Sequence, residues 1–227
     1  MHSTKTSEIP LELTEEQLMN AGFVCLEDVK EASPSDPELS QRITDIGNRI
    51  IWLDHEINQA DDGCISRYIL QWNRDDMGKP VEERKPIYLF INSPGGEIST
   101  TFALYDMITM SKTPVYGINV GYAFSGASIV LLACHKRYGT PHSWYMVHRG
   151  SSECSAMDHM SAHNSMRHWD AQVEDMTDIL FTHTNASLDQ ARLFMRTDTY
   201  FNADEALRLG MIESVVSSID DVLESRK

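Results

Sequence analysis

The sequence predicts an α/β domain with a mostly parallel sheet, because apolar strands alternate with amphipathic helices. The strongest strand is residues 86–92 (PIYLFIN), a nearly continuous apolar run of the kind that is buried on both faces of a parallel sheet. The next strand, 114–120 (PVYGINV), begins where Pro114 ends the intervening helix. Apolar residues recur at helical spacing between them (Ile98, Phe102, Tyr105 and Ile108). Strand, helix and strand in this order indicate βαβ units.

Composition excludes several classes of function. The chain has 227 residues, of which 41% are hydrophobic, and a net charge of −15. Such an acidic protein is a poor partner for a phosphate backbone. The N-terminus has neither a basic nor an apolar signal-peptide region, and the longest apolar run, 129–134, is far short of the ~20 residues of a membrane span. We therefore expect a cytoplasmic location.

Neither a metal site nor a cofactor is expected. The four cysteines are scattered and form no CxxC pair, so reduced thiols are the simplest interpretation. His159 and His163 have the i,i+4 spacing of a metal-binding helix, but no glutamate follows His159 as a general base would.

The chain is expected to divide into a peripheral segment, 1–40, and a main domain, 41–227. The first segment has a capping-box spacing at Thr14 that predicts a helix from Glu15, a strand or arm at 23–29, and a polar linker with two prolines at 32–38. Strand 49–53 and a helix over about 60–72 open the main domain, and 74–85 is a charged surface connection.

A long helix is predicted over about 158–183. Its apolar residues recur with a period of 3.5 (Ala162, Met166, Trp169, Val173, Met176 and Leu180). A helix packed on its own domain and a helix that projects toward another subunit would both show this pattern. After it we expect a helix over 187–195, an extended piece at 199–201, a helix capped by Asn202 and ended by Gly210, and a strand at 211–216.

Residues 121–148 carry the candidate chemistry. Ser125 lies on a turn of small residues between strand 114–120 and an apolar helix, 126–134, where free N–H groups point outward. A short loop then leads to strand 143–148, which ends at His148. Taken alone, Ser125 is better interpreted as the N-cap of the helix than as a nucleophile, and composition does not single out any acidic partner. The Gly95-Gly96 turn lacks the Lys-Ser/Thr of a phosphate-binding loop, but its N–H groups are what an oxyanion hole needs.

Four motifs in order make the chain similar to a known family. These are INSPGG followed by a helix containing YDM, the GxAxS turn, the MVH strand end, and FNADEALRLGMIES. Together, over residues 48–216, they resemble the Clp protease proteolytic subunit (ClpP) family, serine peptidases of the ClpP/crotonase superfamily. By this resemblance Ser125 is the nucleophile, His148 the general base and Asp198 the acid that orients it. The Gly96 and Gly126 amides form the oxyanion hole. The order Ser–His–Asp differs from the Ser–Asp–His order of α/β-hydrolases.

The resemblance also implies a fold and partners. The fold is a ClpP/crotonase-like β-β-α superhelix with a projecting handle helix at 158–183, which gives the 3.5-residue period a role in ring-to-ring contact. Family members form two stacked heptameric rings and cleave unfolded chains that an ATP-dependent AAA+ unfoldase supplies. Tyr88 and Phe90 fall where the family places aromatic residues of the pocket for that partner.

The chain departs from the family pattern in three places. It has Arg149-Gly150 where the family usually has Gln-Pro, Thr197 where an arginine often precedes the acid, and an unrelated N-terminal segment. The alternatives are therefore a phage-type capsid-processing protease of the same clan and a non-catalytic structural subunit of a mixed ring. A crotonase-type acyl-CoA enzyme would have no use for the three triad residues, and a membrane signal-peptide peptidase relative would need a spanning segment.

Overall fold

The computed structural model describes residues 37–59, 62–151 and 158–223, which belong to two compact units, 1–50 and 51–227. The described part of the first unit contains helix α3 (Pro37–Gly47). This helix begins inside the segment interpreted as a linker, and proline is well tolerated in a first helical turn. The predicted helix from Glu15 and the strand or arm at 23–29 lie outside the described residues.

A branched, mainly parallel sheet organises the second unit. Its strands are β1 (Ile50–Leu53, whose first residue belongs to the first unit), β2 (Ile87–Ser93), β3 (Val115–Phe124), β4 (Lys136–Gly139), β5 (Trp144–Val147), β6 (Thr199–Asn202) and β7 (Ser214–Val215). They are ordered β1-β2-β3-β4-β7. The first half of the long strand β3 pairs with β4 and its second half with β5, both in parallel, whereas β5 and β6 are antiparallel. The predicted parallel α/β fold is confirmed.

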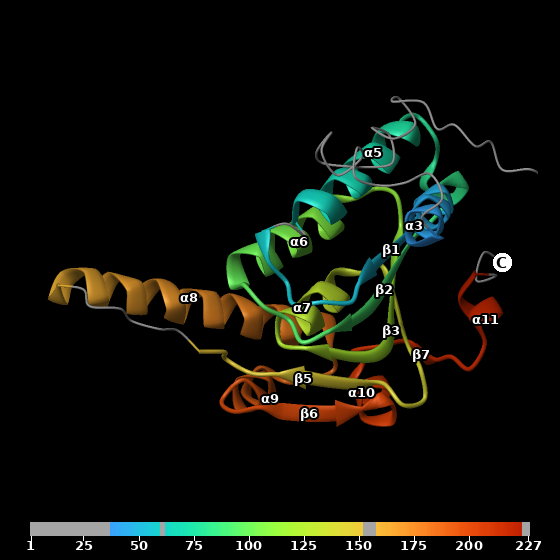
Figure 1. Cartoon of the computed structure of the whole chain (residues 1–227). Coiled ribbons are helices and arrows are strands. Elements are labelled where there is room, and N and C mark those ends of the chain that lie inside the picture. Colours follow the sequence, from blue (N-terminus) through green and yellow to red (C-terminus); the bar gives the residue numbers. More distant parts are fainter. Residues whose placement is uncertain (1–36, 60–61, 152–157, 224–227) are drawn as a thin grey trace, which may run out of the picture. The chain divides into compact units, whose positions relative to one another are not determined.

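The helices of the second unit, among the described residues, are the π-helical turn η1 (Asp62–Ser66), α5 (Arg67–Asp75), the 3-10 turn η2 (Val81–Glu83), α6 (Ile98–Met110), α7 (Gly126–Ala133), α8 (His159–His183), α9 (Leu188–Phe194), α10 (Ala203–Leu209) and α11 (Ile219–Leu223). Helix α7 packs directly on β2, β3 and β5, and α6 packs on α7, so these two helices cover one face of the sheet (Figure 1). Every residue of α7 is buried, which explains why this helix is apolar on all sides. Gly117 of β3 faces α7, because a Cβ there would meet Leu131 and Cys134.

The odd-numbered residues of β2 and of the first half of β3 therefore point to the helices, and the even-numbered ones point to the opposite face. That face is aromatic along β1, β2 and β3. Trp52 stacks on Phe90 with ring centroids 4.8 Å apart, and Tyr88 meets Tyr116 edge-on.

Helix α8 extends away from the sheet (Figure 1). Near its C-terminus Met176, Thr177 and Leu180 are buried, whereas Met166, about three turns before Met176, is 62% exposed. The two halves of the helix thus differ, and contact of its projecting half with another subunit stays a prediction. The last turns pack on their own domain, and the first turns project from it as a handle.

Two short strands differ from the sequence prediction. Strand β4 lies in the stretch that was predicted as a short loop, and the predicted strand 211–216 is reduced to β7. Strand β4 has only four residues and begins with two basic ones, so it carries no apolar run. Its strand conformation comes from parallel pairing with β3 on one side and β7 on the other, which is a tertiary effect.

One arginine, Arg137, connects the C-terminal ends of three helices. The Arg137 guanidinium donates to the carbonyls of Leu132, His183 and Gly210, at 3.5, 3.4 and 3.3 Å. These carbonyls lie at the C-terminal ends of α7, α8 and α10, where a positive charge is favourable. Burial and the nearby Arg137 charge lower the pKa of His183, so its neutral ring accepts the Tyr105 hydroxyl, with Oη and Nε2 2.8 Å apart.

We expect Arg137→Met to lower the free energy of unfolding by about 3 kcal/mol, because the carbonyls at three helix ends lose a charged donor. Arg137→Lys keeps the charge but reaches fewer carbonyls, and should lose roughly half as much. Urea unfolding at fixed protein concentration measures both. Equal stability of wild type and Arg137→Met would show that the arginine does not hold these helix ends.

Candidate active site

Ser125 lies on a strained turn between β3 and α7. Its φ of +54° and ψ of −122° are unusual for any residue but glycine, and such a conformation costs about 1–3 kcal/mol unless the surroundings impose it. Here they do. The Ser125 N–H donates to the Met146 carbonyl of β5 at 2.8 Å, and the buried Ser128 hydroxyl lies 2.6 Å from the Ala123 carbonyl. The turn is thus attached to both strands beside it.

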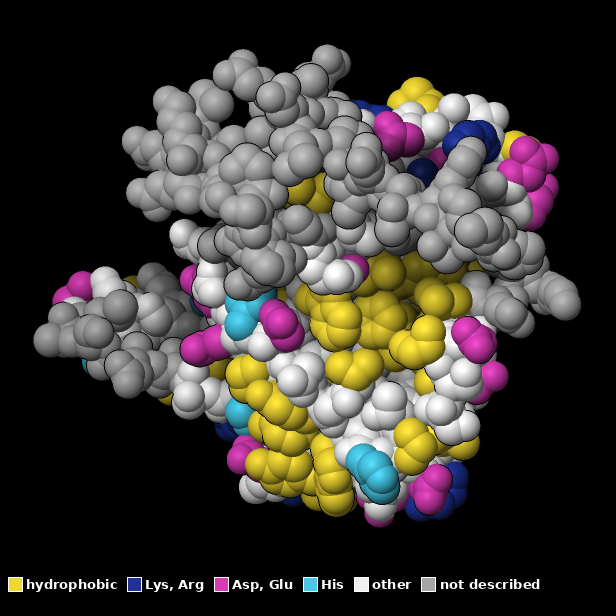
Figure 2. Space-filling model, turned by 45° about the vertical axis from the view of Figure 1, so that its right-hand side comes forward, with side chains coloured by type: hydrophobic (Ala, Val, Ile, Leu, Met, Phe, Trp, Pro, Cys, Tyr) yellow, Lys and Arg dark blue, Asp and Glu magenta, His cyan; other side chains and the backbone are white. Residues whose placement is uncertain are grey.

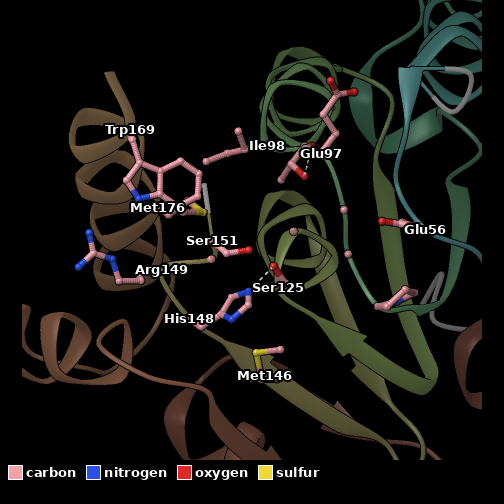
Figure 3. A pocket seen from close by; sticks show the side chains of 16 residues that line it. Glu56, Glu97, Ile98, Ser125, Met146, His148, Arg149, Ser151, Trp169 and Met176 are labelled. Atoms are coloured by element: carbon pink, nitrogen blue, oxygen red, sulfur yellow. Dashed lines mark hydrogen bonds between the residues drawn. The ribbon is translucent and has the colours of Figure 1, made fainter. Parts of the chain in front are cut away.

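The Ser125 hydroxyl is not used as a helix cap. Ser125 occupies the N-cap position of α7, but its side chain makes no capping hydrogen bond. Its Oγ instead lies 2.8 Å from Nε2 of His148, the residue that follows β5 (Figure 3). The alternative of a serine that only caps a helix therefore does not describe this side chain.

His148 joins Ser125 to Asp198. Its Nδ1 lies 2.8 Å from Oδ1 of Asp198, which precedes β6. An ionised carboxylate accepts only, so Nδ1 carries the proton and the Nε2 lone pair faces the serine hydroxyl. The His148 side chain is 24% exposed and that of Asp198 is 58% exposed. The three residues that the sequence singled out thus form one continuous hydrogen-bonded series, open to solvent at its acidic end.

The glycine turn after β2 lies against the serine turn. Gly95 has a φ of +86°, and a Cβ there would meet the backbone of Phe124 and Gly126. Ser93 anchors the turn, because its hydroxyl donates to the His55 carbonyl at 2.5 Å and accepts the Gly95 N–H at 3.1 Å. The INSPGG motif therefore forms a turn and also lets this turn pack directly against the turn that carries Ser125.

Two N–H groups flank Ser125 and are free to bind an oxyanion. Ile57 donates to the Gly95 carbonyl and accepts the Glu97 N–H, at 2.8 and 2.9 Å, in a parallel bridge opposite Gly96. Alternation of the peptide groups directs the Gly96 N–H away from Ile57. Gly126 supplies the first N–H of α7, which no helical carbonyl can accept. Among the described residues, neither N–H has a hydrogen-bond acceptor.

These residues line a cleft of about 540 Å³. Ile98 from α6 and Trp169 and Met176 from α8 form an apolar wall, and Figure 3 shows the indole reaching from α8 toward Ile98 above the Ser125–His148 pair. Glu56 and Arg149 also line the cleft. An extended peptide could lie along it with its carbonyl carbon beside Ser125.

Trp169 explains one departure from the family pattern. A Cβ on Gly150 would lie 3.1 Å from the indole, and Gly150 has a φ of +75°. A glycine two residues after His148 therefore gives the indole room to lie over the loop. The Arg149–Asp170 pair, at 3.6 Å between exposed groups, contributes little.

The roles of Trp169 and Met176 in the cleft were not predicted, although their seven-residue spacing placed them on one face of α8. The sequence also did not point to the role of Ile57 in holding the glycine turn, because Ile57 is an isolated apolar residue in a polar stretch.

The two residues predicted for partner docking are less accessible than expected. Tyr88 and Phe90 are 4% and 5% exposed, and Trp52, which stacks on Phe90, is 44% exposed. A partner that reaches this site would meet Trp52 first. The sequence did not point to Trp52, because it lies in a short strand that reads simply as buried.

Three further features of the described residues concern metal binding, thiol reactivity and membrane crossing. They contain no cluster of three His, Cys, Asp or Glu side chains that could hold a metal ion. Burial raises the pKa of the Cys134 thiol to about 12, which leaves it unreactive at neutral pH. None of the helices in the described ranges combines the length and apolar character that a membrane crossing requires.

The two glycine substitutions Gly95→Ala and Gly78→Ala form a matched pair. Both glycines have nearly the same φ, +86° and +87°, but a Cβ on Gly78 meets nothing within 4 Å. Gly78→Ala should cost about 1 kcal/mol of stability and leave Ser125 reactivity unchanged. Gly95→Ala should lower the rate of Ser125 labelling by a fluorophosphonate about 100-fold or more, because it separates the two turns. Equal labelling rates in the two variants would contradict this close packing.

Comparison with known proteins identifies the family of this chain. The family model "Clp protease" matches residues 40–219. The chain is 30% identical over 205 residues to ATP-dependent Clp protease proteolytic subunit 2 of Treponema denticola, which covers 87% of this chain and 96% of the relative. It is 33% identical to the subunit 2 of Prochlorococcus marinus subsp. pastoris, over 74% of this chain and 82% of that one. The subunit 1 of Rhodopirellula baltica is 30% identical, over 74% and 72%. The chain therefore belongs to the Clp protease family, as a ClpP-type proteolytic subunit.

Proposed function

We propose that this chain is a serine endopeptidase that hydrolyses peptide bonds of unfolded proteins through Ser125, His148 and Asp198. The observation that carries the proposal is the unbroken series of two 2.8 Å contacts, from the serine hydroxyl through the imidazole to the carboxylate. A lone serine or histidine in a cleft has many possible roles. A serine hydroxyl facing an imidazole nitrogen whose other nitrogen is held by a carboxylate matches the requirements of nucleophilic catalysis.

The chemistry proceeds in two halves. The Ser125 Oγ attacks the peptide carbonyl carbon as His148 Nε2 takes its proton, and the carbonyl oxygen becomes an oxyanion between the Gly96 and Gly126 N–H groups. Collapse breaks the C–N bond, and the leaving amine takes the proton from His148. Water then attacks the acyl-enzyme with His148 again as base, which releases the carboxylic acid and restores Ser125.

Asp198 orients the base and stabilises the imidazolium that forms in each half. Its side chain is 58% exposed, so water screens its charge in the isolated chain. We therefore assign to Asp198 a smaller share of the rate than a fully buried triad carboxylate would have.

The cleft supports a substrate preference. The wall of Ile98, Trp169 and Met176 fits an uncharged side chain next to the scissile bond. A chain must be extended to enter such a cleft, which agrees with unfolded protein as the substrate.

Membership of the family supports a proposal for the assembly. The relatives are named as subunits of an ATP-dependent protease. We propose homo-oligomeric heptameric rings, stacked in pairs through α8, in the cytoplasm, with ATP used by a separate AAA+ unfoldase that docks at Trp52, Tyr88 and Phe90. The capsid-processing protease and the inactive subunit of a mixed ring remain the alternatives. The first would act without the unfoldase, and the second would not react at Ser125.

Labelling by a fluorophosphonate probe tests the chemistry. Wild type should be labelled and Ser125→Ala should not. We expect peptide hydrolysis to fall at least 10⁴-fold in His148→Ala and about 10²- to 10³-fold in Asp198→Asn, because the exposed carboxylate contributes less than the base. Wild-type labelling no better than that of Ser125→Ala would refute the protease function.

Native mass tests the stacked rings. A heptamer of 25.7 kDa subunits has a mass of about 180 kDa and a stacked pair about 360 kDa. Met166→Glu places a charge on the projecting half of α8, so it should convert the larger species to the smaller one. A wild-type protein that is monomeric by native mass spectrometry would contradict the ring assembly even if Ser125 reacts.

A further inference from the structure

Asp198 reaches His148 because of the register between β5 and β6. Val147 pairs with Thr199 in this antiparallel ladder, so the same register continued by one residue places His148 opposite Asp198. Successive side chains of a strand point to opposite faces. His148 and Asp198 therefore share one face of the two strands, whereas Thr199 points to the other face, on which Phe201 is buried.

The face that carries Asp198 gives its carboxylate little support. Tyr200, two residues further along the same face, is 50% exposed, and Figure 2 shows hydrophobic side chains at the surface in a band over the lower part of the molecule, where β5 and β6 lie in Figure 1. Among the described residues, the Asp198 carboxylate has no hydrogen-bond or ion-pair partner besides His148, and the nearby Arg196 is exposed. The placement of Asp198 therefore depends on how its backbone is held.

Thr199 holds this backbone from the covered face. Its hydroxyl oxygen lies 2.9 Å from the Phe194 carbonyl and 3.1 Å from the Thr197 carbonyl. Phe194 is the last residue of α9, where a carbonyl has no donor within the helix. The Thr197 carbonyl belongs to the peptide group that joins Thr197 to Asp198. The single hydroxyl proton thus connects the end of α9 to the turn that carries the acid.

Helix α9 is a fixed support for this turn. It packs on α8, its Ala191 is buried, and Ser187 and Gln190 form a capping box at its N-terminus. The Phe194 ring also meets Phe201 of β6 edge-on, with centroids 5.2 Å apart. The end of α9 and strand β6 are therefore joined by packing as well as by the hydroxyl. Loss of the hydroxyl should release the turn between them without unfolding either element.

We propose that Thr199 is a positioning residue for the triad, which acts on the reaction through Asp198. A triad carboxylate works by holding the imidazole in the correct tautomer and orientation. A displacement of about 1 Å at such a group can cost about 100-fold in rate. This role rests on the proposed function, because it concerns the acid of the same site. The competing interpretation is a hydroxyl that only satisfies the end of α9 and has no effect on the rate.

Thr199→Val removes the hydroxyl and keeps a β-branched side chain of nearly the same size, which suits a strand. We expect kcat for peptide hydrolysis to fall about 10-fold. KM should stay within about 2-fold, because no residue of the cleft changes. Thr199→Ser keeps the hydroxyl and should retain kcat within about 2-fold of wild type. The matched control is Thr184→Val, which removes a hydroxyl 2.6 Å from the Leu180 carbonyl at the end of α8 and should leave kcat unchanged.

A double variant separates positioning from a purely structural role. Asp198→Asn leaves no carboxylate to place, so adding Thr199→Val to it should cost no further rate. A second 10-fold loss (about the size of the first) in that background would show that the hydroxyl acts elsewhere and would overturn the positioning role. Wild-type kcat in Thr199→Val would overturn it as well. Circular dichroism identifies a variant that fails to fold, and Thr199→Ala then takes the place of Thr199→Val.

Crystal structures of the variants test the placement without any reaction. The contact between His148 Nδ1 and Asp198 Oδ1 should stay near 2.8 Å in Thr199→Ser and Thr184→Val, and should exceed hydrogen-bond distance in Thr199→Val. An unchanged contact in Thr199→Val refutes the positioning role even if kcat falls. Fluorophosphonate labelling of wild type separates the two proposals. Unlabelled wild type with a lengthened contact in Thr199→Val refutes only the protease function, and labelled wild type with an unchanged contact refutes only the positioning role.

Discussion

The hydrogen bond from the Ser125 N–H to the Met146 carbonyl joins the two halves of the site. It attaches the turn that carries the nucleophile to the strand that ends at His148, and it helps to hold Ser125 at a positive φ that serine disfavours. The buried Ser128 hydroxyl supports the same junction from below. Because β3 and β5 run in parallel here, both turns emerge at the same edge of the sheet, where strand ends carry functional residues in α/β folds.

The small residues of this region serve packing first. Gly126 carries no side chain because a Cβ would meet Thr101 of α6, and Gly95 carries none because a Cβ would meet the turn at Ser125. Because these glycines lack side chains, α6, α7 and the glycine turn can pack closely together. This packing leaves the Gly96 and Gly126 N–H groups beside Ser125. This close packing would hold the proposed oxyanion hole in a fixed geometry, which such a site needs.

Sequence and structure agree where local patterns decide the outcome. The apolar strands, the capped helices and the long helix with a 3.5-residue period follow from propensity and periodicity, and the candidate nucleophile and base stand at strand ends that these patterns locate. Asp198 could not be found in this way, because β6 reaches His148 only by antiparallel pairing with β5. The prediction of strand β4 failed for the same reason, because its pairing with β3 and β7 outweighs its weak intrinsic preference for a strand. Family resemblance, not composition, supplied the acid.

One departure from the family pattern lies beside α8. Gly150 stands where the family usually has proline, and a Cβ at this position would lie 3.1 Å from the Trp169 indole. The glycine therefore lets α8 lie close to the loop after His148. The projecting half of α8 leaves apolar side chains exposed, among them Met166. A carboxylate as exposed as Asp198 is poorly placed to stabilise an imidazolium in water. Any neighbour in the proposed ring that excludes water from Asp198 would therefore strengthen its interaction with His148.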